Sequence, residues 1–80
     1  MTVDYQPIPC VQHEQLEFSV LRKQHLQLEY GENGKSLSET VLPLDVNTRN
    51  GAEWLLFRRE NGSEAEIRLD TIVSFHSARH

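Results

Sequence analysis

The chain has 80 residues and a formal net charge of −4, with 38% of its residues hydrophobic and 25% charged. This length and composition are typical of one small soluble domain with a single modest core, and no apolar run approaches the roughly 20 residues that a membrane span needs. The first ten residues have neither the basic patch nor the apolar core of a secretory signal, and a single cysteine excludes an internal disulfide. We therefore expect a cytoplasmic protein.

Negative charge is concentrated in the first quarter of the chain. Asp4, Glu14 and Glu17 precede Arg22, the first basic residue, so residues 1–21 contain three acidic residues and no basic one. An acidic surface disfavours general binding to nucleic acid and permits docking on a basic partner. A solvated surface that maintains solubility is the commoner explanation of such a pattern.

The segment DYQPIPC stiffens the entrance to the domain. Tyr5, Pro7, Ile8 and Pro9 are expected to form a rigid strap within residues 1–10 that packs on the rest of the fold and fixes the direction of the following helix. Each proline removes backbone freedom from the unfolded chain. Simple coverage of an apolar flank explains the same residues equally well.

A helix is predicted over residues 11–21. Pro9 fixes a backbone dihedral that suits a first helical turn. Glu14 and Glu17 then lie toward the positive end of the helix dipole, and Arg22 lies toward its negative end. The apolar positions also alternate as a strand would, so this prediction depends on the end signals.

Residues 24–76 have the pattern of short strands. Leu26, Leu28 and Tyr30 alternate with polar residues, and the turn GENG precedes a second strand that begins near Leu37. Pro43 and the polar stretch LDVNTRNG are predicted to break the next pairing. The apolar run WLLF then indicates a strand that is covered on both faces.

The last part of the chain, EIRLDTIVSFH, follows a turn at ENGS. It indicates a strand through Ile67 and Leu69, a pivot at Asp70 and Thr71, and a final strand. The strands supply a predicted core of eight residues: Leu26, Leu28, Leu55, Phe57, Ile67, Leu69, Ile72 and Phe75.

The fold class that follows is mostly β with one N-terminal helix, an Sm-like small β-barrel or sandwich of about five strands. The whole chain forms one domain, with a strap at 1–10, a helix at 11–21 and a barrel at 24–76. An OB-type barrel usually has a helix between its third and fourth strands, and the eight residues 45–52 are too short and too rich in turn formers to form one.

Several segments together resemble the Rho-binding antiterminator (Rof) family: YQPIPC, Leu16 and Glu17 in the helix, LQLE before a glycine turn, and EIRLDTIVSF. The resemblance covers nearly the whole chain. It implies an Sm-like fold and binding to the transcription termination factor Rho at its primary RNA-binding site, which blocks RNA loading and reduces termination. It also implies partner contacts from the helix and from the loop before WLLF, at His13, Glu14, Glu17, Arg49 and Asn50.

Two other functions stay open at this point. One is a direct RNA-binding Sm-like module that uses Arg49, Arg58, Arg59 and Arg68 on one face, and the other is a small-ligand sensor of the WYL kind. Net negative charge favours the Rho partner over RNA, and the lack of an evident polar pocket motif in the sequence favours it over a small ligand.

Neither catalysis nor a bound cofactor is expected. Cys10 and His13 have a metal-like spacing, but the sequence lacks the second ligand pair of a structural zinc site, so we expect no metal. No phosphate-binding motif continues from GENG. We expect a monomer, because an inhibitor that covers a site on another protein gains nothing from pairing its own edge strands.

Overall fold

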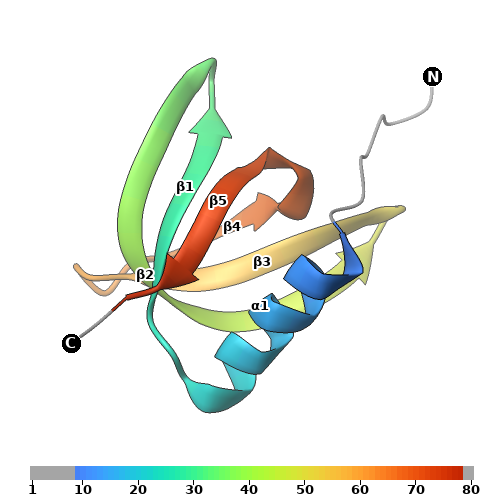
Figure 1. Ribbon diagram of the computed structural model, residues 1–80. Coiled ribbons are helices and arrows are strands. Elements are labelled where there is room, and N and C mark those ends of the chain that lie inside the picture. The colour runs from blue at the N-terminus through green and yellow to red at the C-terminus, as the bar shows by residue number, and fades with distance from the viewer. Residues whose placement is uncertain (1–8, 79–80) are drawn as a thin grey trace.

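The computed structural model describes residues 9–78, so most of the predicted strap lies outside the described residues. Helix α1 (Cys10–Arg22) precedes a run of five strands (Figure 1). These are β1 (Leu26–Glu32), β2 (Lys35–Arg49), β3 (Ala52–Arg59), β4 (Glu64–Arg68) and β5 (Ile72–Ser77), with the short 3-10 helix η1 (Leu69–Thr71) between the last two.

The strands form one antiparallel sheet in the order β4-β3-β2-β1-β5. The long strand β2 belongs to both halves of this sheet, because residues 35–41 pair with β1 and residues 41–49 pair with β3. Figure 1 shows the resulting bend, with α1 lying across one open side. The predicted class, mostly β with one N-terminal helix and five strands, is confirmed, and β4 and β5 are the two edges of a sheet that is curved but not closed.

Two Asn-Gly turns fix the register of the hairpins. Asn33 and Gly34 join β1 to β2 with φ of 52° and 76°, and Asn50 and Gly51 join β2 to β3 with φ of 52° and 75°. Positive φ at both central positions is the mark of a type I′ turn, whose twist matches that of the flanking strands. The hairpin predicted at GENG is therefore confirmed.

The prediction that Pro43 and LDVNTRNG break the pairing is wrong. Strand β2 continues through the proline, and its ladder with β3 shifts register between Pro43 and Asp45. Such a bulge accommodates a residue that has no N–H to donate and increases the local bend. Pro43 thus lies at the bend of one continuous strand and not at a break between two strands.

The core lies between the two halves of the bent sheet and beneath α1. Its buried hydrophobic residues are Leu16, Leu26, Leu28, Tyr30, Val41, Ala52, Leu55, Phe57 and Leu69, and the Pro43 side chain is buried as well. Five of the eight predicted core residues are among them, whereas Ile67, Ile72 and Phe75 are only partly buried. These three lie on the edge strands and their junction with η1, where one side has no neighbouring strand.

Helix α1 extends one residue beyond the predicted range at each end. Pro9 is its N-cap, and the Pro9 carbonyl accepts a hydrogen bond from the His13 N–H at 3.1 Å. The first turn contains no acidic residue, so Glu14 and Glu17 lie farther from the positive end of the dipole than the sequence predicted. Leu16 and Ser19 form the buried side of the helix.

Candidate functional site

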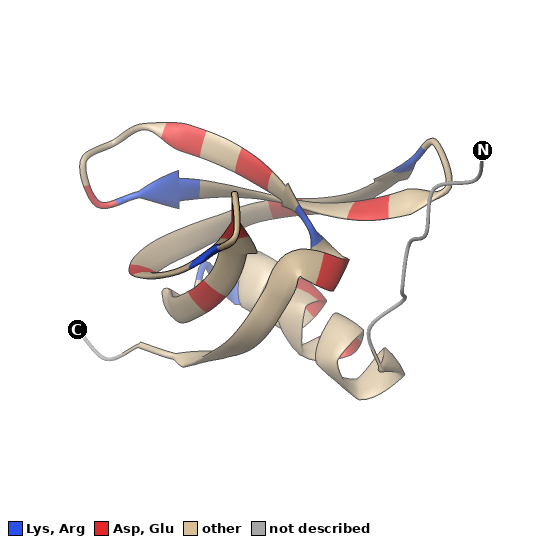
Figure 2. Cartoon of the chain, turned by 90° about the horizontal axis from the view of Figure 1, so that it is seen from above, with Lys and Arg blue, Asp and Glu red and all other residues tan. Residues whose placement is uncertain are grey.

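Both predicted helix carboxylates are exposed. At 3.6 residues per turn, Glu14 and Glu17 lie away from the buried Leu16 and share about a third of the helix circumference with three apolar residues. We call this set the outer face of α1: Val11, Glu14, Glu17, Phe18 and Leu21. The acidic positions of the helix are red in Figure 2. The outer face is therefore accessible to a partner and carries net negative charge.

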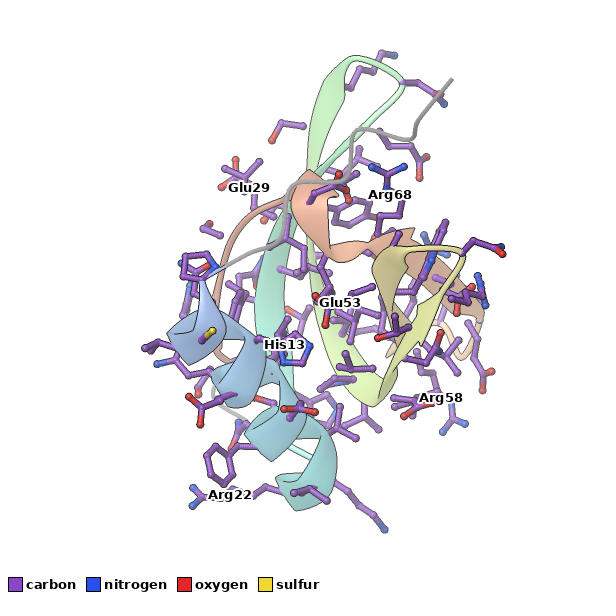
Figure 3. All side chains as sticks on the ribbon, turned by 90° about the vertical axis from the view of Figure 1, so that its right-hand side faces the viewer. His13, Arg22, Glu29, Glu53, Arg58 and Arg68 are labelled. Atoms are coloured by element: carbon purple, nitrogen blue, oxygen red, sulfur yellow. The ribbon has the colours of Figure 1, made fainter. Side chains whose placement is uncertain are left out.

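His13 lies on the side of α1 that faces the sheet. Its Nε2 atom is 2.6 Å from Oε2 of Glu53 on β3, and its Nδ1 atom is 3.3 Å from Oε1 of Glu17 (Figure 3). Both contacts are within the distance of an ion pair. The His13 side chain is only 24% exposed, so most of it faces the protein and not solvent. His13 therefore links the helix to β3.

Arg49 is held in place at the end of β2. Its guanidinium pairs with both carboxylate oxygens of Glu66 on β4, with Nη1 3.1 Å from Oε2, and lies over the Trp54 ring at 4.6 Å from the ring centroid. The hydrogen bond from Arg49 lowers the pKa of the Glu66 carboxyl below its ordinary value. Arg49 is thus preorganised, although part of its hydrogen-bonding capacity is already used.

Asn50 has an exposed side chain at the tip of the β2–β3 turn. The left-handed backbone there, with φ of 52°, is one that asparagine adopts more readily than most residues. Turn geometry alone therefore accounts for an asparagine at this position. Its exposed amide also leaves it free to contact a partner.

The fold brings the helix and loop parts of the predicted site to one end of the molecule. Glu53, which contacts His13, lies opposite Thr48 in the β2–β3 ladder, and the next pair, Arg49 and Ala52, closes the hairpin. In Figure 1 the start of α1 and the tip of this hairpin both lie toward the right, whereas Figures 2 and 3 show them separated across the molecule. A single partner surface would have to extend across this end of the molecule to contact both parts.

The four arginines considered for RNA binding all have carboxylate partners. Arg49 pairs with Glu66, and the other pairs are Arg58 with Glu64 at 3.0 Å, Arg59 with Glu39 at 3.0 Å, and Arg68 with Asp70 at 2.5 Å. In each pair, the carboxylate neutralises the positive charge of the arginine locally. The arginines therefore do not form the cationic surface that phosphate binding requires.

A cluster that the sequence did not reveal connects the three central strands. The Tyr30 hydroxyl donates to Glu39, and Arg59 Nε donates to both oxygens of the same carboxylate at 3.0 and 3.2 Å. Burial, together with the hydrogen bond to Glu39, raises the pKa of Tyr30. Because the three residues come from β1, β2 and β3, only strand pairing reveals this cluster, and its role is to hold the sheet together.

No family model matches the chain, and no curated protein matches it. Among residues 9–78, no helix has the length and apolar character needed to cross a membrane. Over the same part of the chain, no group of three or more His, Cys, Asp or Glu side chains could hold a metal ion.

Proposed function

We propose that this chain is a non-enzymatic, cytoplasmic inhibitor of Rho-dependent transcription termination. It binds Rho at the primary RNA-binding site and competes with RNA. The observation that carries this proposal is the exposure of Glu14 and Glu17 on the outer face of α1, a helix that His13 links to β3 through Glu53. The segment resemblance to the Rof family supplies the identity of the partner.

Electrostatics supports competition with RNA. A site that binds RNA phosphates has to be basic, so a protein with exposed carboxylates can be attracted to it by the same forces. The net charge of −4 adds a long-range contribution of the same sign. The inhibitor therefore occupies the site in place of the phosphate backbone.

The arrangement of the fold supports one interface made from two segments. His13 holds the first half of α1 near β3 through Glu53, and the turn at Asn50 follows directly from the β2–β3 ladder. Both segments are thus positioned before binding, which lowers the entropic cost of association. The strand order and the bent β2 support the Sm-like fold that the resemblance implies.

The pairing of the arginines favours Rho over direct RNA binding. RNA would have to displace the carboxylate partners of Arg49, Arg58 and Arg59, and the displaced carboxylates would repel its phosphates. A protein partner at the outer face of α1 requires no such rearrangement. We further propose that the inhibitor acts as a monomer.

A pull-down with purified Rho tests the proposal. The immobilised chain should retain Rho, and an excess of cytidine-rich RNA should release it, because the two ligands share one site. The same RNA offered without Rho should not bind the chain. Failure to retain Rho, or retention of the RNA itself, would contradict the proposal.

A further inference from the structure

The outer face of α1 is apolar as well as acidic. The structure describes four exposed large hydrophobic residues, and three of them are on this face: Val11 is 65% exposed, Phe18 55% and Leu21 77%. The fourth, Val73 on β5, is 64% exposed. Single exposed apolar residues are ordinary, but three on one side of a 13-residue helix form a local concentration.

The apolar and acidic side chains are immediate neighbours. Glu14, Glu17, Phe18 and Leu21 together line one surface depression of about 250 Å³. Phe18 also lines a second depression of about 460 Å³ between α1 and β5, so its ring stands between the two. The Arg22 guanidinium lies 5.7 Å from the centroid of that ring.

These apolar residues contribute little to the core. The helix packs on the sheet through Leu16 and Ser19, whose positions are on the opposite side from Leu21. Folding therefore does not explain why Phe18 and Leu21 are large and apolar. Phe18 and Leu21 have the i, i+3 spacing of the apolar anchors with which a helix docks in a groove of a partner.

The charges select the class of partner. The phosphates of RNA and of anionic lipids would be repelled by Glu14 and Glu17, and a phosphate backbone offers no apolar recess for Leu21. A protein surface can present cations beside an apolar recess. Charge complementarity therefore points to a basic protein surface as the occupant.

We propose that the outer face of α1 docks with Phe18 and Leu21 as apolar anchors in a recess of a basic protein surface, while Glu14 and Glu17 pair with cations at its rim. The inference rests on the proposed function, because Rho is the partner used to test it. It adds that much of the affinity is apolar and insensitive to salt, whereas the carboxylates carry the salt dependence.

The test uses Phe18→Gln, Leu21→Gln and their double variant in titrations with Rho at low and high salt. Glutamine preserves helix propensity and net charge. The double variant should bind Rho at least about tenfold more weakly, the scale of removing a hot-spot side chain, with the salt dependence of the wild type. Val73→Thr, which alters an equally exposed apolar residue on β5, should bind as the wild type does.

The outcomes distinguish this inference from the proposed function. If wild type binds Rho and the folded double variant binds equally well, the apolar anchors are refuted and the proposed function stands. If wild type does not bind Rho, both fail. If light scattering shows a wild-type dimer that the double variant loses, the occupant is a second copy and the inference is wrong. Leu21→Gln alone, at the most exposed position, decides the question should the double variant not fold.

Discussion

Replacing Glu14 and Glu17 together by lysine should severely weaken binding to Rho. Two unit charges about 4 Å apart attract each other by about 1 kcal/mol in water and about 4 kcal/mol near a protein surface. Reversal turns attraction into repulsion, so the lower figure gives about 2 kcal/mol per site and about 4 kcal/mol for both. Since 1.4 kcal/mol is tenfold in affinity, the dissociation constant should rise by about a thousandfold at low salt.

Both glutamates are exposed, so the fold should survive the change. The lysine variant loses the 3.3 Å contact between Glu17 and His13. The loss of such an i,i+4 pair costs about 0.3 kcal/mol. The matched control is Glu32→Lys with Glu60→Lys, two exposed residues at the β1–β2 and β3–β4 turns. Each double variant adds four positive charge units to −4, so both are neutral overall and differ only in where the charge has changed.

Isothermal titration against Rho, at two salt concentrations and with circular dichroism to check folding, measures the effect. The helix variant should lose most of its affinity and the control variant little, and added salt should weaken wild-type binding. Wild-type affinity and salt response in the folded helix variant would refute the acidic-helix mechanism even if Rho remained the partner. A direct RNA binder would instead gain RNA affinity from these reversals.

Three further predictions concern stability and the loop. Tyr30→Phe should lower the free energy of unfolding by about 1–2 kcal/mol in urea titrations, because the hydroxyl bonds the Glu39 carboxylate; no loss would contradict this. The lowered pKa of Glu66 means that its pairing with Arg49 stabilises the fold above its ordinary value of 4.5 and ceases to do so as pH falls through the lowered value. The difference in unfolding free energy between wild type and Glu66→Gln should therefore shrink as the pH falls below 4.5, and a difference independent of pH would refute the assignment. Asn50→Gly keeps the left-handed turn and removes only the side-chain amide, so it should weaken Rho binding through the lost amide contacts. Unchanged binding would show that Asn50 acts only in the turn.

Local sequence signals predicted the elements because their causes are local. The period of two in Leu26, Leu28 and Tyr30 and the Asn-Gly turn predicted the first hairpin, which the structure confirms. The prediction at Pro43 was wrong because a residue without an N–H can lie at the end of a strand or at a bulge within one. Which of the two occurs depends on the pairing with the neighbouring strand. The buried side of α1 was similarly ambiguous, since its apolar residues fit more than one pattern and only packing on β2 selects Leu16.

The candidate site was only partly predictable from the sequence. Exposure of Glu14 and Glu17 follows from their charge, and the Asn50 turn follows from the Asn-Gly pair. The contacts of His13 with Glu53 and of Arg49 with Glu66 join residues distant in the chain, so no local pattern contains them. The apolar part of the outer face was missed because Phe18 and Leu21 have the spacing of buried residues, and only the structure shows which way they face.

Displacement of RNA from Rho is the most direct test of competition for the primary RNA-binding site. A fluorescent cytidine-rich RNA is bound to Rho, the chain is titrated in, and the anisotropy of the RNA is followed. The anisotropy should fall to the value of free RNA, and the apparent dissociation constant of the RNA should rise linearly with the concentration of the chain. RNA that stays bound to Rho at saturating chain, or that transfers to the chain itself, would contradict the claim.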